Sequence, residues 1–173
     1  MTPRIAVLVP CYNEETAIAA VVRDFRAALP GAIVYVYDNN SRDRTVDVAR
    51  EAGAVVRTEP RQGKGNVVRR MFADIEADIY VLVDGDDTYD AASAGAMVEK
   101  LRVEGADLLT ARRIHTEASA YRPGHVFGNK LLTGLTATLF NVNMPDMLSG
   151  YRVFSRRFVK SFPLTAEGFA IET

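Results

Sequence analysis

Short apolar runs alternate with amphipathic stretches along most of this chain. Runs rich in β-branched residues predict five strands, at Arg4–Pro10, Ile33–Tyr37, Ala54–Arg57, Ile79–Val83 and Asp107–Ala111. Between the runs, apolar residues recur at helical spacing, as in Ile18, Val22, Phe25 and Leu29. This alternation predicts an α/β fold with a mostly parallel central sheet and helices on both faces.

The helices have polar and glycine boundaries. We expect Asn13 to cap the first helix, with acids in its first turn, and Ser41 to cap a second helix over 44–52. Further helices are predicted through Val68–Ile75 and over 91–104. Beyond residue 113 the pattern changes to a basic loop, an amphipathic stretch over 126–140, a polar loop, a short strand at 153–154 and a short helix over 156–162.

Length and composition indicate one globular domain. The chain has 173 residues, of which 48% are hydrophobic, and a net charge of −1, which argues against a nucleic-acid binder that relies on bulk charge. The single cysteine excludes an internal disulfide and fits a reducing compartment. Because residues 168–173 look like the start of an element, we expect a single domain over 1–173 that is truncated at its C-terminus.

The strongest chemical signal follows the run Ile79–Val83, which is typical of a strand buried on both faces. The strand ends in Asp84, Gly85, Asp86 and Asp87. Asp84 and Asp86 are two residues apart, so in extended backbone their side chains point to the same side. Crowded carboxylates suit a hard cation such as Mg²⁺ or Mn²⁺, whereas the alternative is a solvated acidic turn.

Polar residues also follow two other predicted strands. The first strand is followed by Tyr12–Glu14 and the second ends in Asp38–Asn40. Since parallel strands end at one sheet edge, these groups and the acids after the fourth strand are expected to converge there. At that edge Asp38 could accept a hydrogen bond from a nucleobase N–H or a ribose hydroxyl, and Glu14 could accept one from a ribose hydroxyl. Lys64 could contact a phosphate. Taken singly, Asp38 is more typical of a helix-capping turn and Glu14 of a helix-dipole acid, but their convergence on one edge favours the binding roles.

The residues around Lys64 and Asp84 partly match three known loop motifs. The residues around Lys64 lack the spacing and the Ser/Thr of a P-loop, and Asp84–Thr88 lacks the glycine and glutamate of an EF-hand loop. Asp84–Thr88 does match the Asp-x-Asp-x-Thr signature of haloacid-dehalogenase-type phosphatases, in which Asp84 would be the nucleophile. A phosphohydrolase is therefore an alternative, although that signature usually follows the first strand.

Several motifs occur along the chain in the order seen in family-two glycosyltransferases of the GT-A fold, which this sequence therefore resembles. The motifs are Val9–Glu15, Asp38–Thr45, Gly63–Gly65 and Asp84–Asp86. Asp146–Arg152 and Gly168–Thr173 look like the polyprenyl-phosphate branch, which includes dolichyl-phosphate mannose synthases. The resemblance covers essentially the whole chain.

The resemblance implies a pocket for a GDP- or UDP-linked sugar donor. Its implied nucleotide-binding residues are Pro10, Tyr12, Asn13, Glu14, Asp38, Asn40, Lys64, Asp84, Gly85 and Asp86. Asp84 and Asp86 would hold a divalent metal, Mg²⁺ or Mn²⁺, on the diphosphate. The donor base and sugar stay open among GDP-mannose, UDP-glucose and UDP-N-acetylglucosamine.

The resemblance also implies a lipid-phosphate acceptor, dolichyl or undecaprenyl phosphate. Its implied acceptor-phosphate residues are Arg112, Arg122, Asn129, Lys130, Thr133 and Arg152. Transfer would be a single in-line displacement with inversion, with Asp86 and Arg112 as catalytic residues. Asp146 is the candidate base if the acceptor is a hydroxyl. The enzyme would be cytoplasmic, lying on a membrane surface or anchored through a missing C-terminal part. A non-catalytic nucleotide-sugar-binding module is a further alternative.

Overall fold

The computed structural model describes residues 2–111 and 149–161, and these residues form a six-stranded mixed sheet. The strands are β1 (Ile5–Cys11), β2 (Ile33–Asp38), β3 (Val55–Thr58), β4 (Ile79–Leu82), β5 (Leu108–Thr110) and β6 (Arg152–Ser155), in the spatial order β3-β2-β1-β4-β6-β5. The first four strands are mutually parallel, and β6 is antiparallel to both its neighbours. The predicted mostly parallel sheet is therefore confirmed.

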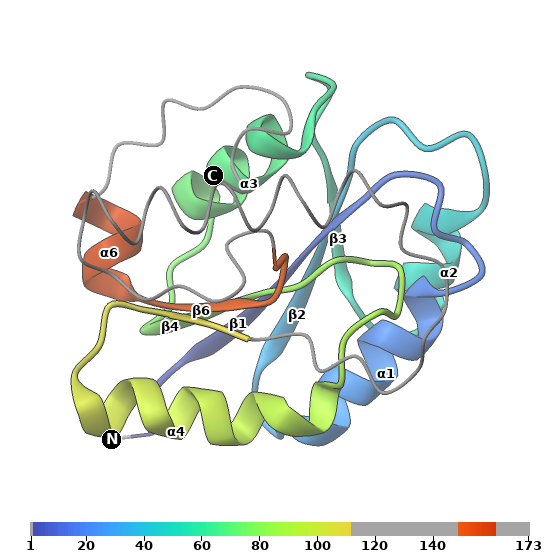
Figure 1. Ribbon diagram of the computed structural model, residues 1–173. Helices are drawn as coiled ribbons and strands as arrows, with labels where there is room; N and C mark the ends of the chain where they lie inside the picture. The colour runs from blue at the N-terminus through green and yellow to red at the C-terminus, as the bar shows by residue number, and fades with distance from the viewer. Residues whose placement is uncertain (1, 112–148, 162–173) are drawn as a thin grey trace, which may run out of the picture.

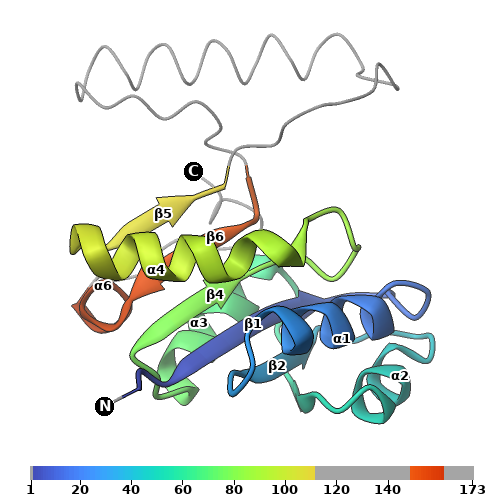
Figure 2. The same cartoon turned by 90° about the horizontal axis from the view of Figure 1, so that it is seen from below.

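Helices cover both faces of this sheet, as predicted. They are α1 (Ile18–Ala28), α2 (Thr45–Glu51), α3 (Lys64–Asp74), α4 (Ala94–Glu104), which follows the 3₁₀ turn η1 (Ala91–Ser93), and α6 (Arg156–Ser161). Figure 1 shows α1 and α4 along one face and α3 and α6 along the other, and Figure 2 shows the same layers from below. Within the described residues no helix is both long and apolar enough to cross a bilayer.

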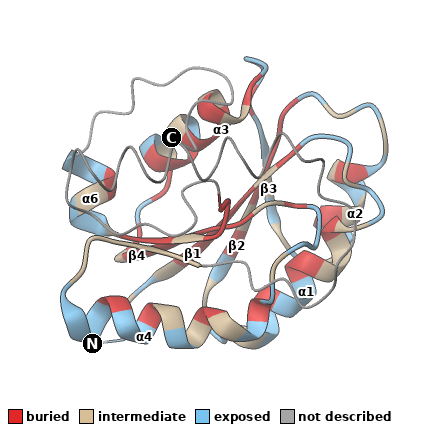
Figure 3. Cartoon of the chain, viewed as in Figure 1, coloured by how far each residue is buried: buried red, intermediate tan, exposed pale blue. Residues whose placement is uncertain are grey.

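The two faces of the sheet have separate hydrophobic cores. Val7 and Val9 of β1 pack into the core beneath α1 and α4, whereas Leu8, between them, packs with Met71 of α3 on the opposite face. All four residues of β4 are buried, which confirms the prediction of a strand covered on both sides. Figure 3 shows the buried residues concentrated in the central strands and on the inner sides of the helices.

The two predicted helix caps are wrong. α1 begins at Ile18 after Ala17, without a side-chain cap or an acid in its first turn, and α2 begins at Thr45 after Arg44. The Asn13 side chain instead accepts a hydrogen bond from the backbone N–H of Arg42, and the Ser41 hydroxyl accepts one from the N–H of Asn13. These side chains join two loops because the neighbouring loop supplies donors that a local sequence pattern cannot reveal.

The strand order contains a switch point at β1. The chain proceeds from β1 to β2 and β3 on one side, and then crosses to β4 on the other side. In open α/β sheets, loops that leave in opposite directions at such a point leave room for a ligand beyond the carboxyl ends of the strands. The predicted helix over 126–140 lies outside the described residues.

Candidate active site

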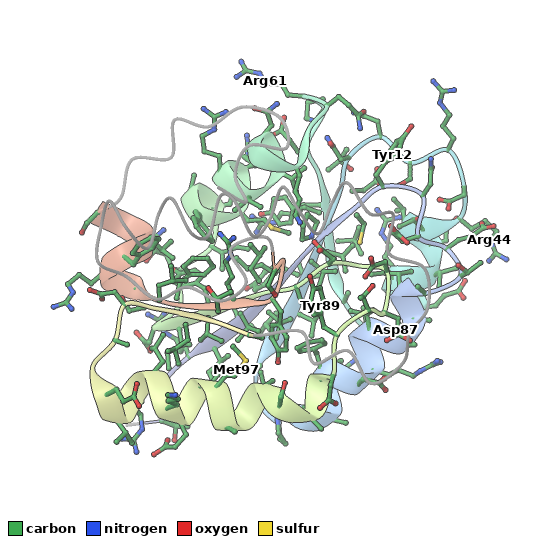
Figure 4. All side chains as sticks on the ribbon, viewed as in Figure 1. Tyr12, Arg44, Arg61, Asp87, Tyr89 and Met97 are labelled. Carbon is green, nitrogen blue, oxygen red and sulfur yellow. The ribbon has the colours of Figure 1, made fainter. Side chains whose placement is uncertain are left out.

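The polar ends of β1, β2 and β4 meet at one edge of the sheet. Cys11 at the end of β1 is in register with Asp38 at the end of β2, and Leu8 is in register with Leu82 of β4. Tyr12, Arg44 and Asp87 lie on the loops at this edge in Figure 4. The predicted convergence of the three polar clusters is thus confirmed by the strand register.

Backbone-to-side-chain hydrogen bonds join the loop after β1 to the loop after β2. Besides the two bonds of Asn13, the N–H of Glu14 donates to the Thr45 hydroxyl at 2.8 Å, and the N–H of Glu15 donates to Asp43 at 3.2 Å. These bonds fix the backbone around Glu14, so its carboxylate is presented from a rigid loop. Tyr12, which lies beside it, is 47% exposed and is available to a ligand.

Each of the three loops turns through a left-handed residue that is not glycine. These residues are Asn13 (φ 58°), Asn40 (φ 70°) and Asp87 (φ 58°). Asn and Asp tolerate this conformation better than other side chains, but it still costs conformational energy. Strained turns of this kind are concentrated at functional sites, which favours this edge as a binding site.

Asp38 stabilises its own turn. Asp38 is 4% exposed, and its carboxylate accepts hydrogen bonds from the backbone N–H groups of Asn40 and Ser41. The carboxylate therefore closes a turn at the end of β2, but it does not cap a helix, because α2 begins at Thr45 after Arg44 without a side-chain cap. A carboxylate also has additional lone pairs with which to bind a ligand. The Asn40 amide donates to the carbonyl oxygen of Pro60 and to the side chain of Gln62, which ties the loop after β2 to the loop after β3.

Asn39 is a structural residue that sequence reasoning missed. It is buried, its amide nitrogen donates to the carbonyl oxygens of Glu59 and Arg61, and its amide oxygen accepts from the N–H of Gly63 at 2.7 Å. Asn39 therefore contributes three hydrogen bonds that hold the loop over 59–63, which leads into Lys64, in addition to those of Asn40. No local signal identifies this role, because the partners of Asn39 lie 20 to 24 residues later in the chain.

Lys64 and Asp84 form an ion pair inside the site. Lys64 Nζ lies 2.6 Å from Asp84 Oδ1, and the two side chains are 13% and 25% exposed. The structure therefore brings the predicted phosphate-binding lysine to the first predicted metal carboxylate. Asp86, the second one, is exposed and accepts a hydrogen bond from the N–H of Thr88.

Two glycines allow the backbone to approach this site closely. A Cβ on Gly85 would lie 2.7 Å from Cys11 Sγ and 3.4 Å from Glu14 Cγ, so glycine brings the Asp84–Asp86 loop against the loop after β1. A Cβ on Gly150 would collide with the Asp84 carboxylate, whose Cγ would be 2.8 Å away. Gly150 was missed in the sequence, although it lies in the polar loop that the resemblance singles out.

Negative charge accumulates between these loops. Burial, together with the charges of Asp86, Asp43 and Asp84, raises the pKa of Glu14. Burial is also the main reason why the pKa of Cys11 is raised well above its usual value, and Glu14, Asp38 and Asp84 add to the effect. A region that disfavours further anions favours a cation, and the thiol of Cys11 stays protonated and packed.

The donor set fits a divalent cation completed by phosphate oxygens. In the part of the chain that the structure describes, no group of three or more Asp, Glu, His and Cys side chains could hold a metal ion by itself. Mg²⁺ in nucleotide enzymes is typically held by one or two carboxylates plus substrate phosphates, so Asp84 and Asp86 match that requirement.

Arg152 reaches the same edge from late in the sequence. It begins β6 and is in register with Leu82, two residues before Asp84. Its Nε donates to the carbonyl oxygen of Ser149 at 3.0 Å. The other acceptor and catalytic candidates lie outside the described residues: Arg112, Arg122, Asn129, Lys130, Thr133 and Asp146.

Several known proteins are similar to this chain in sequence. Protein RfbJ of Shigella flexneri is 53% identical over 122 residues, which cover 70% of this chain and 95% of RfbJ. Glycosyltransferase AglJ of Haloferax volcanii is 37% identical over 98% of this chain and 56% of its own length. The dolichyl-phosphate hexose transferase of Haloferax volcanii is 28% identical over 93% of this chain and 70% of its own length.

A solved structure shares the fold. Glucosyl-3-phosphoglycerate synthase from Mycobacterium tuberculosis, in complex with Mn²⁺, UDP and glucosyl-3-phosphoglycerate, superposes with a TM-score of 0.80 at 28% identity. The superposition covers 98% of this chain and 62% of the synthase. The chain also matches the family described as Glycosyl transferase family 2 over residues 6–162. The motifs, the site at the sheet edge and this match together show that the chain belongs to glycosyl transferase family 2 and has the GT-A fold.

Proposed function

We propose that this protein transfers a hexose from a nucleoside diphosphate sugar to the phosphate of a polyprenyl lipid, with inversion at the anomeric carbon. The observation that carries the proposal is the acidic edge formed by Glu14, Asp84 and Asp86 next to Lys64. The name of the dolichyl-phosphate hexose transferase supports a lipid phosphate as the acceptor class. Such an acceptor would bring the protein to a membrane surface, on the cytoplasmic side.

The donor occupies the loops after β1, β2 and β4 in this proposal. Tyr12 and Asp38 contact the nucleoside, Glu14 the ribose, and Lys64 the diphosphate. The bound divalent metal, held by Asp84 and Asp86, supplies Lewis-acid stabilisation of the departing diphosphate. Membership of the glycosyltransferase family leaves the phosphohydrolase alternative, with Asp84 as nucleophile, without support.

The chemical step needs little from the protein besides orientation and charge. A phosphate oxygen of the acceptor forms a bond to the anomeric carbon while the bond from that carbon to the donor diphosphate breaks. The acceptor is already an anion, so no side chain has to remove a proton. Arg152, and Arg112 and Arg122 outside the described residues, are the cations proposed to orient the acceptor phosphate.

A second acceptor class is favoured by the solved structure. The synthase that this chain resembles has also been crystallised with Mn²⁺, UDP-glucose and phosphoglyceric acid. A small phosphorylated acceptor with a hydroxyl nucleophile would require a base, for which Asp146 is the candidate.

One assay tests the proposal and separates these acceptors. UDP-glucose, UDP-N-acetylglucosamine and GDP-mannose are each incubated with Mn²⁺ and either undecaprenyl phosphate in detergent or 3-phosphoglycerate. We expect a glycosylated lipid and released nucleoside diphosphate. A glycosylated phosphoglycerate would replace the lipid proposal with the small acceptor. Nucleotide binding without any product would favour a non-catalytic binding module.

The metal role predicts that Asp86→Ala lowers transfer by about 100-fold or more, because a Lewis acid contributes several kcal/mol to the transition state. Since Asp86 is exposed, the free energy of unfolding should change by less than about 0.5 kcal/mol. Asp87→Asn is the matched control, because Asn tolerates the left-handed backbone of Asp87 and the variant also loses one carboxylate. Equal turnover in the Asp86 variant and the control would contradict the metal role.

A further inference from the structure

The ion pair between Lys64 and Asp84 fills the position that the proposed function assigns to a metal. Lys64 is the first residue of α3, and its ammonium approaches Asp84 Oδ1 to 2.6 Å. Both side chains are mostly out of water, at 13% and 25% exposure. An ion pair shielded in this way is stronger than an exposed pair, because less solvent screens the two charges.

The second oxygen of Asp84 is also confined. It faces Gly150, at which a Cβ would collide with this carboxylate. One oxygen therefore contacts an ammonium and the other faces the main chain. A divalent cation that bound Asp84 in this arrangement would lie next to the ammonium of Lys64, and the two positive charges would repel each other.

The diphosphate of a nucleotide offers Lys64 a different partner. The lysine side chain is a flexible four-carbon stem that carries a point charge, so it can turn toward an anion without movement of the backbone. It also stands at the N-terminus of an 11-residue helix, where the helix dipole favours a phosphate.

We propose that Lys64 is a placeholder cation for Asp84, which a nucleoside diphosphate draws away so that Mg²⁺ or Mn²⁺ can bind the carboxylate. The inference rests on the proposed metal-dependent function and adds an order of binding to it. The nucleotide binds before the metal or together with it, and the metal alone binds weakly. The site is thereby protected from occupation by a free divalent cation when no donor is present.

Manganese binding to wild type and to Lys64→Met tests this order. Free Mn²⁺ is measured by electron paramagnetic resonance during titration, without nucleotide and with saturating UDP or GDP. In wild type the nucleotide should tighten Mn²⁺ binding by about 5- to 150-fold, the usual range of coupling between sites. In Lys64→Met, Mn²⁺ alone should bind roughly 10-fold more tightly, and the nucleotide should add several-fold less.

Arg70→Met is the matched control. It removes one positive charge from the same helix, but Arg70 pairs with Asp74 at the other end, at 2.8 Å. Its manganese affinities should equal those of wild type. Lys64→Arg keeps the charge and should retain weak binding of Mn²⁺ alone. Lys64→Gln is a second neutral variant, and thermal unfolding shows that each protein is folded.

The coupling distinguishes a placeholder from a simple change in charge. If Lys64→Met tightens Mn²⁺ by the same factor with and without nucleotide, the lysine does not move and the inference is wrong, while the proposed function stands. Unchanged affinity of the folded neutral variants, Lys64→Met and Lys64→Gln, for Mn²⁺ alone would likewise show that the inference is wrong. If wild type binds no Mn²⁺ even with UDP or GDP, both the inference and the metal-dependent function are wrong.

Discussion

Asp84 is the most constrained residue of the site. It follows a strand that is buried on both faces, pairs with Lys64, and faces a glycine from a segment more than 60 residues later in the chain. The orientation of its carboxylate is therefore set by three separate parts of the sequence. Metal and nucleotide affinities should respond to substitutions that do not themselves remove a ligand.

Gly150→Ala is the sharpest of these substitutions. The added methyl group would collide with the Asp84 carboxylate, so either the carboxylate or the loop over 149–151 must move. Over-packing of this kind costs about 1–3 kcal/mol of unfolding free energy. We expect weaker binding of Mn²⁺ in the presence of UDP or GDP, measured by calorimetry, together with a lower urea midpoint.

Gly95→Ala is the control for that variant. Gly95 lies in the first turn of α4, where an added Cβ would be 3.9 Å from its nearest neighbour outside the helix, the carbonyl oxygen of Ala28. The nucleotide and metal affinities of Gly95→Ala should be unchanged. A Gly150→Ala variant with the affinities of wild type would show that the carboxylate does not depend on this contact.

Glu14 should reduce stability at neutral pH. Its pKa is raised by burial and by nearby carboxylates, so the folded protein holds this proton to a higher pH than the unfolded chain does. Stability therefore falls as pH rises through the folded pKa of Glu14. Glu14→Gln should raise the melting temperature by about 2 °C at pH 7.

The pH dependence of the increase in melting temperature tests whether the Glu14 carboxylate is its cause. Below about pH 3, where the carboxyl is protonated in both states, the melting temperatures of wild type and Glu14→Gln should agree. An equal gain at both pH values would instead indicate better packing of the amide. Loss of the carboxylate should also weaken donor binding, since the proposed ribose contact disappears.

At the scale of elements, the loop over 59–63 depends on the buried amide of Asn39. Asn39→Ala would leave the N–H of Gly63 and two carbonyl oxygens without this partner, at about 1–3 kcal/mol for each buried group. We expect faster amide hydrogen exchange in 59–63 and weaker nucleotide binding, because this loop positions Lys64.

Asn66→Ala tests whether the effect is specific to Asn39. The Asn66 amide is near the surface and donates to the carbonyl oxygen of Gln62 at 3.1 Å, so it contacts the same loop from outside. Its loss should cost less than about 1 kcal/mol. If both variants speed exchange in 59–63 equally, the loop is held by the sum of its contacts and not by the buried amide.

The sequence predicted the strands and helices better than the contacts between loops. Apolar periodicity located all six strands to within one residue, because buried faces repeat at fixed spacing. The helix starts were located less well, since α3 begins at Lys64, before the predicted stretch Val68–Ile75, and α1 begins at Ile18 and not directly after Asn13. The caps at Asn13 and Ser41 were wrong, and Gly150 and Asn39 were missed, for a shared physical reason. Their partners come from distant loops, and no local pattern encodes which loops will be neighbours.

At the scale of the whole molecule, the antiparallel strand β6 joins β5 to the four parallel strands of the sheet. Val153 is fully buried and is in register with both Val81 and Leu109. Val153→Ala should lower the free energy of unfolding by about 2 kcal/mol in a single transition seen by both circular dichroism and fluorescence.

Val103→Ala provides the comparison, because Val103 is 71% exposed on α4. Its stability should lie within about 0.5 kcal/mol of wild type. Two separate transitions in the Val153 variant would show that β5 and β6 unfold independently of β1–β4.

The position of β6 between β4 and β5 also has a consequence during biosynthesis. β5 pairs with β6 and β4 pairs on its outer side with β6, yet β6 is made last of the three. At roughly 5–20 residues per second, a ribosome needs several seconds to proceed from β5 to β6. Throughout that interval the outer edge of β4 is not yet covered by β6, so the nascent polypeptide is open to aggregation, or to capture by a chaperone, until β6 is added to the sheet.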